Sequence, residues 1–341
     1  MQNKLTAPHK LINSDGRLVE SGWTDHLILE YDPRDIKLNR MNIKEWDSYI
    51  IISSSGEYAL SMCFADKRYT GLVNACFYDI KNGRQYEFFN PKVLPGAKIC
   101  LPRTSESGSV VFKDSLCELM FLVTGNDRHL YCRYSSFFGN ELEVNVHLGF
   151  DRSDASVVVA APFDSDGTQF CLNQKIPCMP ASGYVRLNSD EYPFSPQSDF
   201  GVLDWGRGVW TQSCDRLWCS GSGVVNSKRF GFNLGYGLGN MSSAGENAVF
   251  YDGVCHKLGR VVIEPPFGDV NKPWKVRSED KRFEAEIMPS FNCETKHSLS
   301  ILNYTEKMMF GKMSGSAVLD DGTAVTVSEL SCFCERTKNK Y

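Results

Sequence analysis

Short apolar runs separated by turn signals recur about every ten residues along the whole chain, and this rhythm constrains the fold more than any other feature. Residues 47–53, 58–64 and 70–78 are rich in β-branched and aromatic side chains. Asn82-Gly83 suits a hairpin turn, because both residues tolerate positive φ. No long stretch carries the period of a helix. The pattern predicts an all-β protein of antiparallel sandwiches or barrels.

The chain has 341 residues, which suggests two domains or one large all-β unit. The same rhythm continues in the second half, where Asn226-Ser227 and Asp252-Gly253 are expected hairpin turns. Prolines and a glycine interrupt the pattern at Pro177–Gly183. We therefore expect two packed antiparallel halves, residues 1–180 and residues 181–341, each resembling a β-barrel or sandwich.

Composition excludes several classes of protein. Hydrophobic residues make up 42% and charged residues 23%, which excludes a disordered chain. The formal net charge is -4, so no basic excess indicates nucleic acid as a partner. No segment reaches the roughly 20 apolar residues of a membrane span, and the first ten residues do not form a secretory signal. We expect a cytoplasmic protein, and the pattern does not set its oligomeric state.

The thirteen cysteines are interpreted as small buried hydrophobes. Their odd number, without a secretory signal, argues against a disulfide framework. Cys332-Phe333-Cys334 is a close pair whose two thiols share one face of a strand. It lacks the second pair that a zinc site needs. The sequence has no convincing match to a nucleotide-binding loop, a G-x-S-x-G motif or an H-E-x-x-H motif. We therefore expect neither a metal nor a cofactor.

An acid and a guanidinium lie among indoles in the densest cluster of chemically interesting residues, which contains Asp204, Trp205, Arg207, Trp210 and Trp218. Such a set suits the lining of a concave apolar site. Burial among aromatic rings would raise the pKa of Asp204, whereas Arg207 would lower it. Alternatively, Asp204 and Arg207 form a structural ion pair that closes the end of a barrel.

Other polar or aromatic residues are candidates for ligand contact or catalysis. They are Glu45, Trp46, Asn173, Lys175, Asn233, Tyr236, Glu246, Asn247 and His256. Asn173 and Lys175 lie beside the expected boundary and could reach into a cleft or cap a strand. Tyr236 and Glu246 could orient water or the polar end of a substrate. His256 could act as an acid or base, or be a satisfied structural histidine.

Several segments carry a resemblance to a known family. They are residues 43–49, 173–183, 203–210, 230–237, 246–253, 256–258 and 338–341. On these segments the chain strongly resembles the bacterial family called domain of unknown function 2804. An acid beside an aromatic residue, then Gly and a Trp-rich strand, is also similar to the carotenoid hydratase (hydroxyneurosporene synthase) and tocopherol cyclase group. That resemblance implies two lipocalin-like β-barrel halves, with Asp204 as the motif acid and Trp205 where many members have His.

Two functions follow from these interpretations. The first is binding of a hydrophobic small molecule, such as a lipid, terpenoid or polyene, in an aromatic-lined barrel cavity. The alternative is a cofactor-independent hydratase, isomerase or cyclase in which Asp204 is the general acid. The indoles Trp205, Trp210 and Trp218 would then shelter a carbocation. In either case the expected partner is a hydrophobic small molecule.

Overall fold

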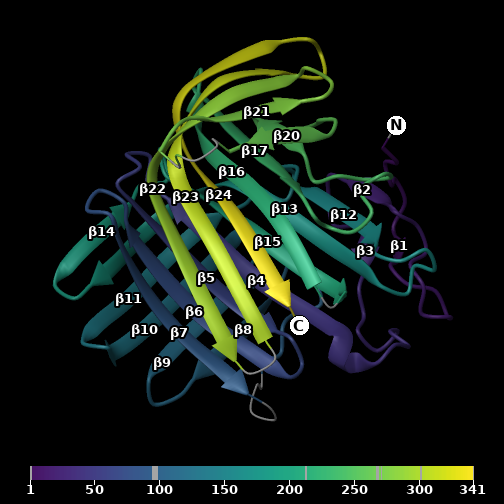
Figure 1. The fold of residues 1–341 in the computed structure, drawn as a ribbon, viewed down its shortest axis with the longest axis horizontal. Coiled ribbons are helices and arrows are strands. Elements are labelled where there is room, and N and C mark those ends of the chain that lie inside the picture. The colour runs from purple at the N-terminus through teal and green to yellow at the C-terminus, as the bar shows by residue number, and fades with distance from the viewer. Residues whose placement is uncertain are drawn as a thin grey trace.

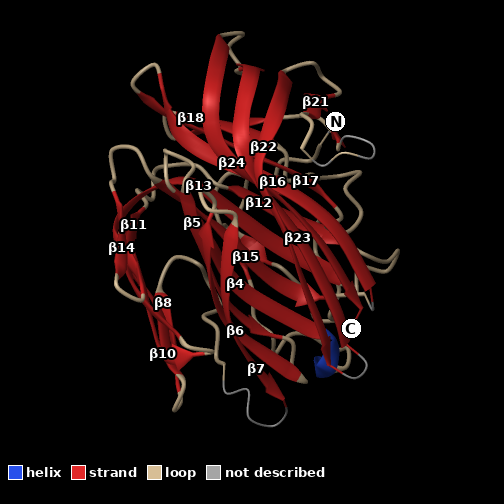
Figure 2. Ribbon diagram, turned by 60° about the vertical axis from the view of Figure 1, so that its left-hand side comes forward, coloured by secondary structure: helices blue, strands red, loops and turns tan. Residues whose placement is uncertain are grey.

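The computed structural model describes residues 2–93, 99–211, 213–265, 269, 271–299 and 302–340. Strands account for nearly all its regular structure, and one short 3-10 turn, Arg40–Asn42, is the blue element in Figure 2. Within those ranges, no helix has the length and apolar character needed to cross a membrane. The expected all-β class is confirmed.

The first sheet contains thirteen strands, in the order β7-β6-β5-β4-β15-β13-β11-β10-β9-β8, with β12 and β14 beside β13 and β2 beside β12. Its strands are β2 (Gly22–Thr24), β4 (Ile43–Ile52), β5 (Tyr58–Asp66), β6 (Thr70–Asp79), β7 (Arg84–Val93), β8 (Gly108–Lys113), β9 (Cys117–Thr124), β10 (Asp127–Phe137), β11 (Asn140–Gly149), β12 (Val157–Pro162), β13 (Phe170–Leu187), β14 (Asp190–Phe194) and β15 (Phe200–Val209). A separate small sheet pairs β1 (His9–Lys10) with β3 (Leu29–Glu30).

The second sheet contains nine strands in the order β19-β18-β17-β16-β24-β23-β22-β21-β20. They are β16 (Ser213–Val225), β17 (Lys228–Tyr236), β18 (Ala248–Tyr251), β19 (Val254–Lys257), β20 (Val261–Glu264), β21 (Trp274–Ser278), β22 (Phe283–Leu299), β23 (Leu302–Val318) and β24 (Ala324–Lys340). The turns expected at 226–227 and 252–253 are confirmed, since all four residues have positive φ.

Each of the two large sheets is antiparallel and curls around a core of its own. The first core gathers side chains such as Phe64, Phe121 and Leu148. The second gathers Phe230 and Phe283. Alternation explains the division, because successive side chains of a strand point to opposite faces of its sheet. The molecule therefore consists of two curled half-barrels, as the sequence pattern and the resemblance predict.

The two half-barrels press their outer faces together. In Figure 1 the long strands β22, β23 and β24 lie in front of the strands of the first sheet. Ile50 and Val202 of the first sheet share an apolar cluster with Trp218, Met308 and Phe333 of the second. Every residue of β15 is buried, because one of its faces lines the first core and the other meets the second sheet. The candidate residues of β15 therefore divide between two environments.

The boundary expected near residue 180 lies inside β13, whose residues pair with neighbours on both sides of that position. The chain passes from the first sheet to the second between Val209 and Ser213. In sheet terms, β13 and β15 both belong to the first half-barrel.

The cysteine interpretation needs one correction. Cys219 and Cys334 form a disulfide, and they lie directly opposite each other on the neighbouring strands β16 and β24. The predicted absence of disulfides is wrong for this pair, because strand pairing brings together two residues 115 positions apart. Cys332 and Cys334 share the second core, as alternation predicts. No cluster that could hold a metal ion occurs among the described residues.

Candidate functional site

Asp204 and Arg207 of β15 point to opposite faces of the first sheet. They are three positions apart, and an odd separation along a regular strand changes the face. Asp204 faces the second sheet and its nearest cations are Lys175 and Arg216. The alternative in which Asp204 and Arg207 form a structural ion pair is therefore wrong, and strand alternation is the physical reason.

Arg207 belongs to the interior of the first half-barrel and is fully buried. Its Nη2 donates to Asp47 Oδ1 at 2.7 Å and to the carbonyl of Pro102 at 2.7 Å, and its guanidinium stacks on Trp205. Glu45 lies on this same face of β4, where it accepts from Tyr31 and Arg68. These contacts are typical of a structural polar network inside a core.

Arg207→Met is expected to lower the free energy of unfolding by about 2–3 kcal/mol, because it leaves the Asp47 carboxylate buried without its cation. Urea unfolding measures the loss. Arg336→Met is the matched control, since Arg336 pairs with Asp215 at the surface and should cost about 1 kcal/mol or less. Equal losses in the two variants would contradict the structural role of Arg207.

Asp204 is the centre of a polar network between the sheets. Its Oδ2 accepts from Arg216 Nη1 at 2.8 Å, and its Oδ1 lies 2.6 Å from Lys175 Nζ. Asn173 Nδ2 also donates to Oδ1, at 2.7 Å. Only 4% of Asp204 is exposed. The carboxylate therefore joins β13 and β15 of the first sheet to β16 of the second.

Further candidate residues extend this network. Glu246 Oε2 lies 3.8 Å from Lys175 Nζ and 4.0 Å from Arg216 Nη2. Asn233 Nδ2 donates to the Glu246 carbonyl at 2.9 Å, while Asn233 Oδ1 accepts from Trp218 Nε1 at 2.6 Å. Lys175 Nζ sits 3.9 Å from the centre of the Trp218 ring, a cation–π contact. Strand pairing within each sheet and packing between the sheets thus collect six of the sequence candidates around one point.

The electrostatics of this network keep Asp204 ionised. Burial alone would raise the pKa of Asp204, but Arg216 and Lys175 hold it well below its ordinary value. Burial and the Arg216 charge lower the pKa of Lys175 to about 8, against the attraction of Asp204. A carboxyl group that stays ionised cannot donate a proton at neutral pH. The condition for Asp204 as general acid, that burial outweighs the neighbouring cations, is not met.

A cavity of about 130 Å³ opens beside Asp204 between the two sheets. The first sheet contributes Trp46, Ser48, Ile50, Cys63, Leu72 and Asn74 to its lining. The second contributes Arg216, Tyr304, Glu306, Met308, Glu335 and Thr337. Trp210, which follows β15, lines it as well. The cavity lies in the seam between the half-barrels, whereas the sequence interpretation expected it inside a barrel.

Two acids on the second sheet carry raised pKa values. Burial, together with the negative charge of Glu306, raises the pKa of Glu335 to about 8, against the attraction of Arg216. Burial also raises the pKa of Glu306, although its hydrogen bond from the Tyr304 hydroxyl opposes the shift. Glu335 pairs with Met308 and Glu306 with Thr337, so the acids are diagonal neighbours on adjacent strands. The pair therefore retains a proton at neutral pH.

Two of the candidate tryptophans stand at the cavity and two do not. Trp46 and Trp210 line it, and their ring centres are 4.9 Å apart. Gly206 makes room for Trp46, because a Cβ at this position would lie 2.1 Å from the Trp46 ring. Trp218 lies beneath Lys175 in the adjoining network, and Trp205 faces the core of the first half-barrel.

Three remaining candidates lie away from the cavity. Tyr236, at the end of β17, is 41% exposed. Asn247 is buried and its Oδ1 accepts from the Gly235 amide, which is a strand-end contact. His256 lies at the rim of the second half-barrel, where its Nδ1 accepts from the Asp320 amide. None of the three lines the cavity.

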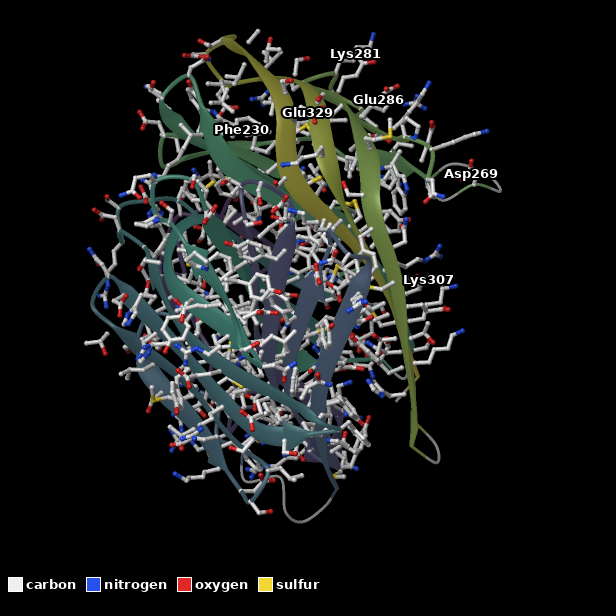
Figure 3. All side chains as sticks on the ribbon, turned by 90° about the vertical axis from the view of Figure 1, so that its left-hand side faces the viewer. Phe230, Asp269, Lys281, Glu286, Lys307 and Glu329 are labelled. Carbon is white, nitrogen blue, oxygen red and sulfur yellow. A yellow bond between two sulfur atoms is a disulfide. The ribbon has the colours of Figure 1, made fainter. Side chains whose placement is uncertain are left out.

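Arg216, Glu306 and Glu335 are the residues that the sequence interpretation missed. For two of them, strand alternation indicates burial. Arg216 shares its face of β16 with Trp218, and Glu306 shares its face of β23 with Met308. Lys307, between Glu306 and Met308 on β23, is exposed on the side turned away from the first sheet (Figure 3). The sequence could therefore show that Glu306 lies on the buried face of its strand. It could not show which residues of other strands contact Glu306.

A family model described as domain of unknown function (DUF2804) matches residues 2–341. The chain belongs to this family. The membership confirms the resemblance seen in the sequence segments. No curated protein matches the chain.

Two solved structures share the fold of this DUF2804 member. A protein from Nitrosomonas europaea, proposed to be an AttH, superposes with a TM-score of 0.51 at 11% identity, over 86% of this chain and 92% of that one. Kievitone hydratase from Nectria haematococca superposes with a TM-score of 0.50 at 9% identity, over 87% of this chain and 88% of that one. At these identities the likeness establishes the architecture of two half-barrels.

Proposed function

We propose that the protein is a cofactor-independent acid–base enzyme of the hydratase or isomerase type, which acts on a hydrophobic small molecule held between the two half-barrels. The observation that carries this proposal is the Glu306–Glu335 pair beside the cavity. A pKa of about 8 keeps Glu335 protonated at neutral pH, so that it can donate a proton without a cofactor. The proposal also places this enzyme in the cytoplasm, as the sequence predicts.

The acid pair can both give and take a proton. In a dehydration, Glu335 donates its proton to the leaving hydroxyl, and the C–O bond breaks with its electrons on the departing water. The Glu306 carboxylate takes the proton from the adjacent carbon, and the electrons of that C–H bond form the C=C bond. The pair holds one proton before and after, so alcohol becomes alkene and water without a co-reactant. The reverse sequence is hydration.

Other residues of the seam support this chemistry by position. Asp204, Arg216 and Lys175 tie the sheets together beside the acids. Ile50 and Met308 give the cavity apolar walls, which suit a hydrophobic substrate and keep the acid pair poorly hydrated. A hydratase with the same architecture, the kievitone enzyme, supports the proposal at the level of reaction class.

Glu335→Gln is expected to lower turnover by about 10²–10⁴-fold, because the amide keeps the shape of the protonated acid but cannot transfer its proton. The purified protein is incubated with metabolite extract of its host. Mass spectrometry then follows compounds that change by one water molecule or rearrange to an isomer. Glu286→Gln, at an exposed position of β22 (Figure 3), is the matched control. Unchanged conversion by Glu335→Gln would overturn the proposal.

A binding protein without turnover is the second candidate, and the cavity beside Asp204 is the observation that favours it. A binding protein needs the lining but no proton transfer. Native mass spectrometry of protein purified from its host would then find a retained small molecule that both wild type and Glu335→Gln release unchanged.

A further inference from the structure

Buried polar atoms without a hydrogen-bond partner gather at the cavity. Among the described residues they include Trp210 Nε1 and the Nε and Nη2 of Arg216. Trp210 is 4% exposed and Arg216 is 8% exposed, and both line the cavity. Buried donors are nearly always paired in folded proteins. Three unpaired N–H groups on residues that line the cavity therefore indicate an oxygen acceptor supplied from outside the chain.

The charges around the cavity indicate a neutral ligand. The charged groups are the cations Lys67, Lys175 and Arg216 and the acids Asp204, Glu246, Glu306 and Glu335. Asp204 lies within 2.8 Å of both buried cations, so Arg216 has no uncompensated charge to offer an anion. An anionic ligand would also meet the nearby acids. The free N–H groups thus suit a neutral oxygen better than a carboxylate.

The size of the cavity limits the part of the ligand that it holds. A cavity of about 130 Å³ is close to the roughly 150 Å³ of an apolar site that holds one benzene ring. Leu72, Ile50 and Met308 supply apolar contacts for such a ring. A longer hydrophobic chain would have to extend beyond the cavity.

We propose that the cavity binds a neutral, ring-sized group bearing a carbonyl or hydroxyl oxygen, and that this oxygen accepts hydrogen bonds from Trp210 Nε1 and Arg216. The inference rests on the proposed function in using the same cavity, and it deepens that function by naming the substrate class. Trp210 and Arg216 fix the oxygen, which determines the substrate atom that meets Glu335. The substrate's defining feature is then a reactive position close to the ring carbon that bears the carbonyl or hydroxyl oxygen.

Wild-type protein tests this inference with small probes. Cyclohexanone offers a ring and a neutral acceptor, toluene offers only the ring, and benzoate offers the ring with a negative charge. Isothermal titration is expected to find cyclohexanone bound at least threefold more tightly than toluene or benzoate. Binding of toluene as tightly as cyclohexanone, preference for benzoate, or binding of no probe, as expected for a cavity that holds water only, would each overturn the inference.

Trp210→Phe removes the Nε1 donor and keeps an aromatic ring. It is expected to weaken the binding of cyclohexanone about threefold to tenfold and to leave the binding of toluene unchanged. The ratio of the two affinities therefore corrects for any general loosening of the cavity. An unchanged ratio would contradict the role of Trp210. Glu335→Gln separates this inference from the proposed function, because it should bind cyclohexanone normally while turnover is lost. The comparison of wild-type probes stands even where a variant does not fold.

Discussion

Asp204→Asn is expected to lower the free energy of unfolding by about 3–5 kcal/mol. The amide cannot neutralise Arg216 and Lys175, which lie 2.8 and 2.6 Å from the carboxylate oxygens and are themselves buried. Both cations would remain in the seam without their main counter-ion. Urea unfolding at neutral pH measures the loss.

Asp215→Asn is the matched control for this prediction. Asp215 also pairs with two cations, Arg336 and Lys338, but its side chain is 45% exposed. Solvent screens that pair, so the expected loss is about 1 kcal/mol or less. Adding Lys175→Met to Asp204→Asn should recover part of the lost stability, because it removes one of the two stranded charges. A loss from Asp204→Asn no larger than that from Asp215→Asn would contradict the assignment of Asp204 as the central ion-pair partner of the seam.

Local signals predicted the strands well, because turns and alternation are written in neighbouring residues. Asn226-Ser227 and Asp252-Gly253 adopt the positive φ values that their composition favours. β11 buries Leu142 and its alternate apolar neighbours while its polar residues face outward. Such features depend on a few adjacent side chains, so a single sequence contains enough information to identify them.

The site was only partly predictable, because its partners come from strands that are distant in sequence. Alternation alone excludes an Asp204–Arg207 pair, because residues three positions apart on a regular strand point to opposite faces. Alternation could not show that Arg216 meets Asp204, because that contact crosses from one sheet to the other. The raised pKa of Glu335 likewise depends on Glu306, which is brought close by the pairing of β23 with β24. Packing between the two sheets decides the first contact, and the register of β23 with β24 decides the second.

Glu335 should make the stability of the wild-type protein fall as the pH rises. Burial and Glu306 raise its pKa in the folded protein to about 8 from an ordinary value of 4.5. Between these values the folded state holds a proton that the unfolded state has released. Since stability falls with pH wherever the folded state binds more protons, Glu335 destabilises the fold progressively from about pH 4.5 to pH 8 and by a constant amount above that range.

Glu335→Gln removes this titration while keeping the shape of the neutral acid. The variant is expected to match the wild type near pH 5 and to exceed its free energy of unfolding by about 1–3 kcal/mol at pH 8, because each unit of pKa shift is worth about 1.4 kcal/mol before solvent screening reduces it. Urea unfolding at several pH values between 5 and 9 measures the gap, with exposed Glu286→Gln as the control. A gap that stays constant or narrows as the pH rises would show that Glu335 is already ionised in the fold, and the acid of the proposed reaction would be lost with it.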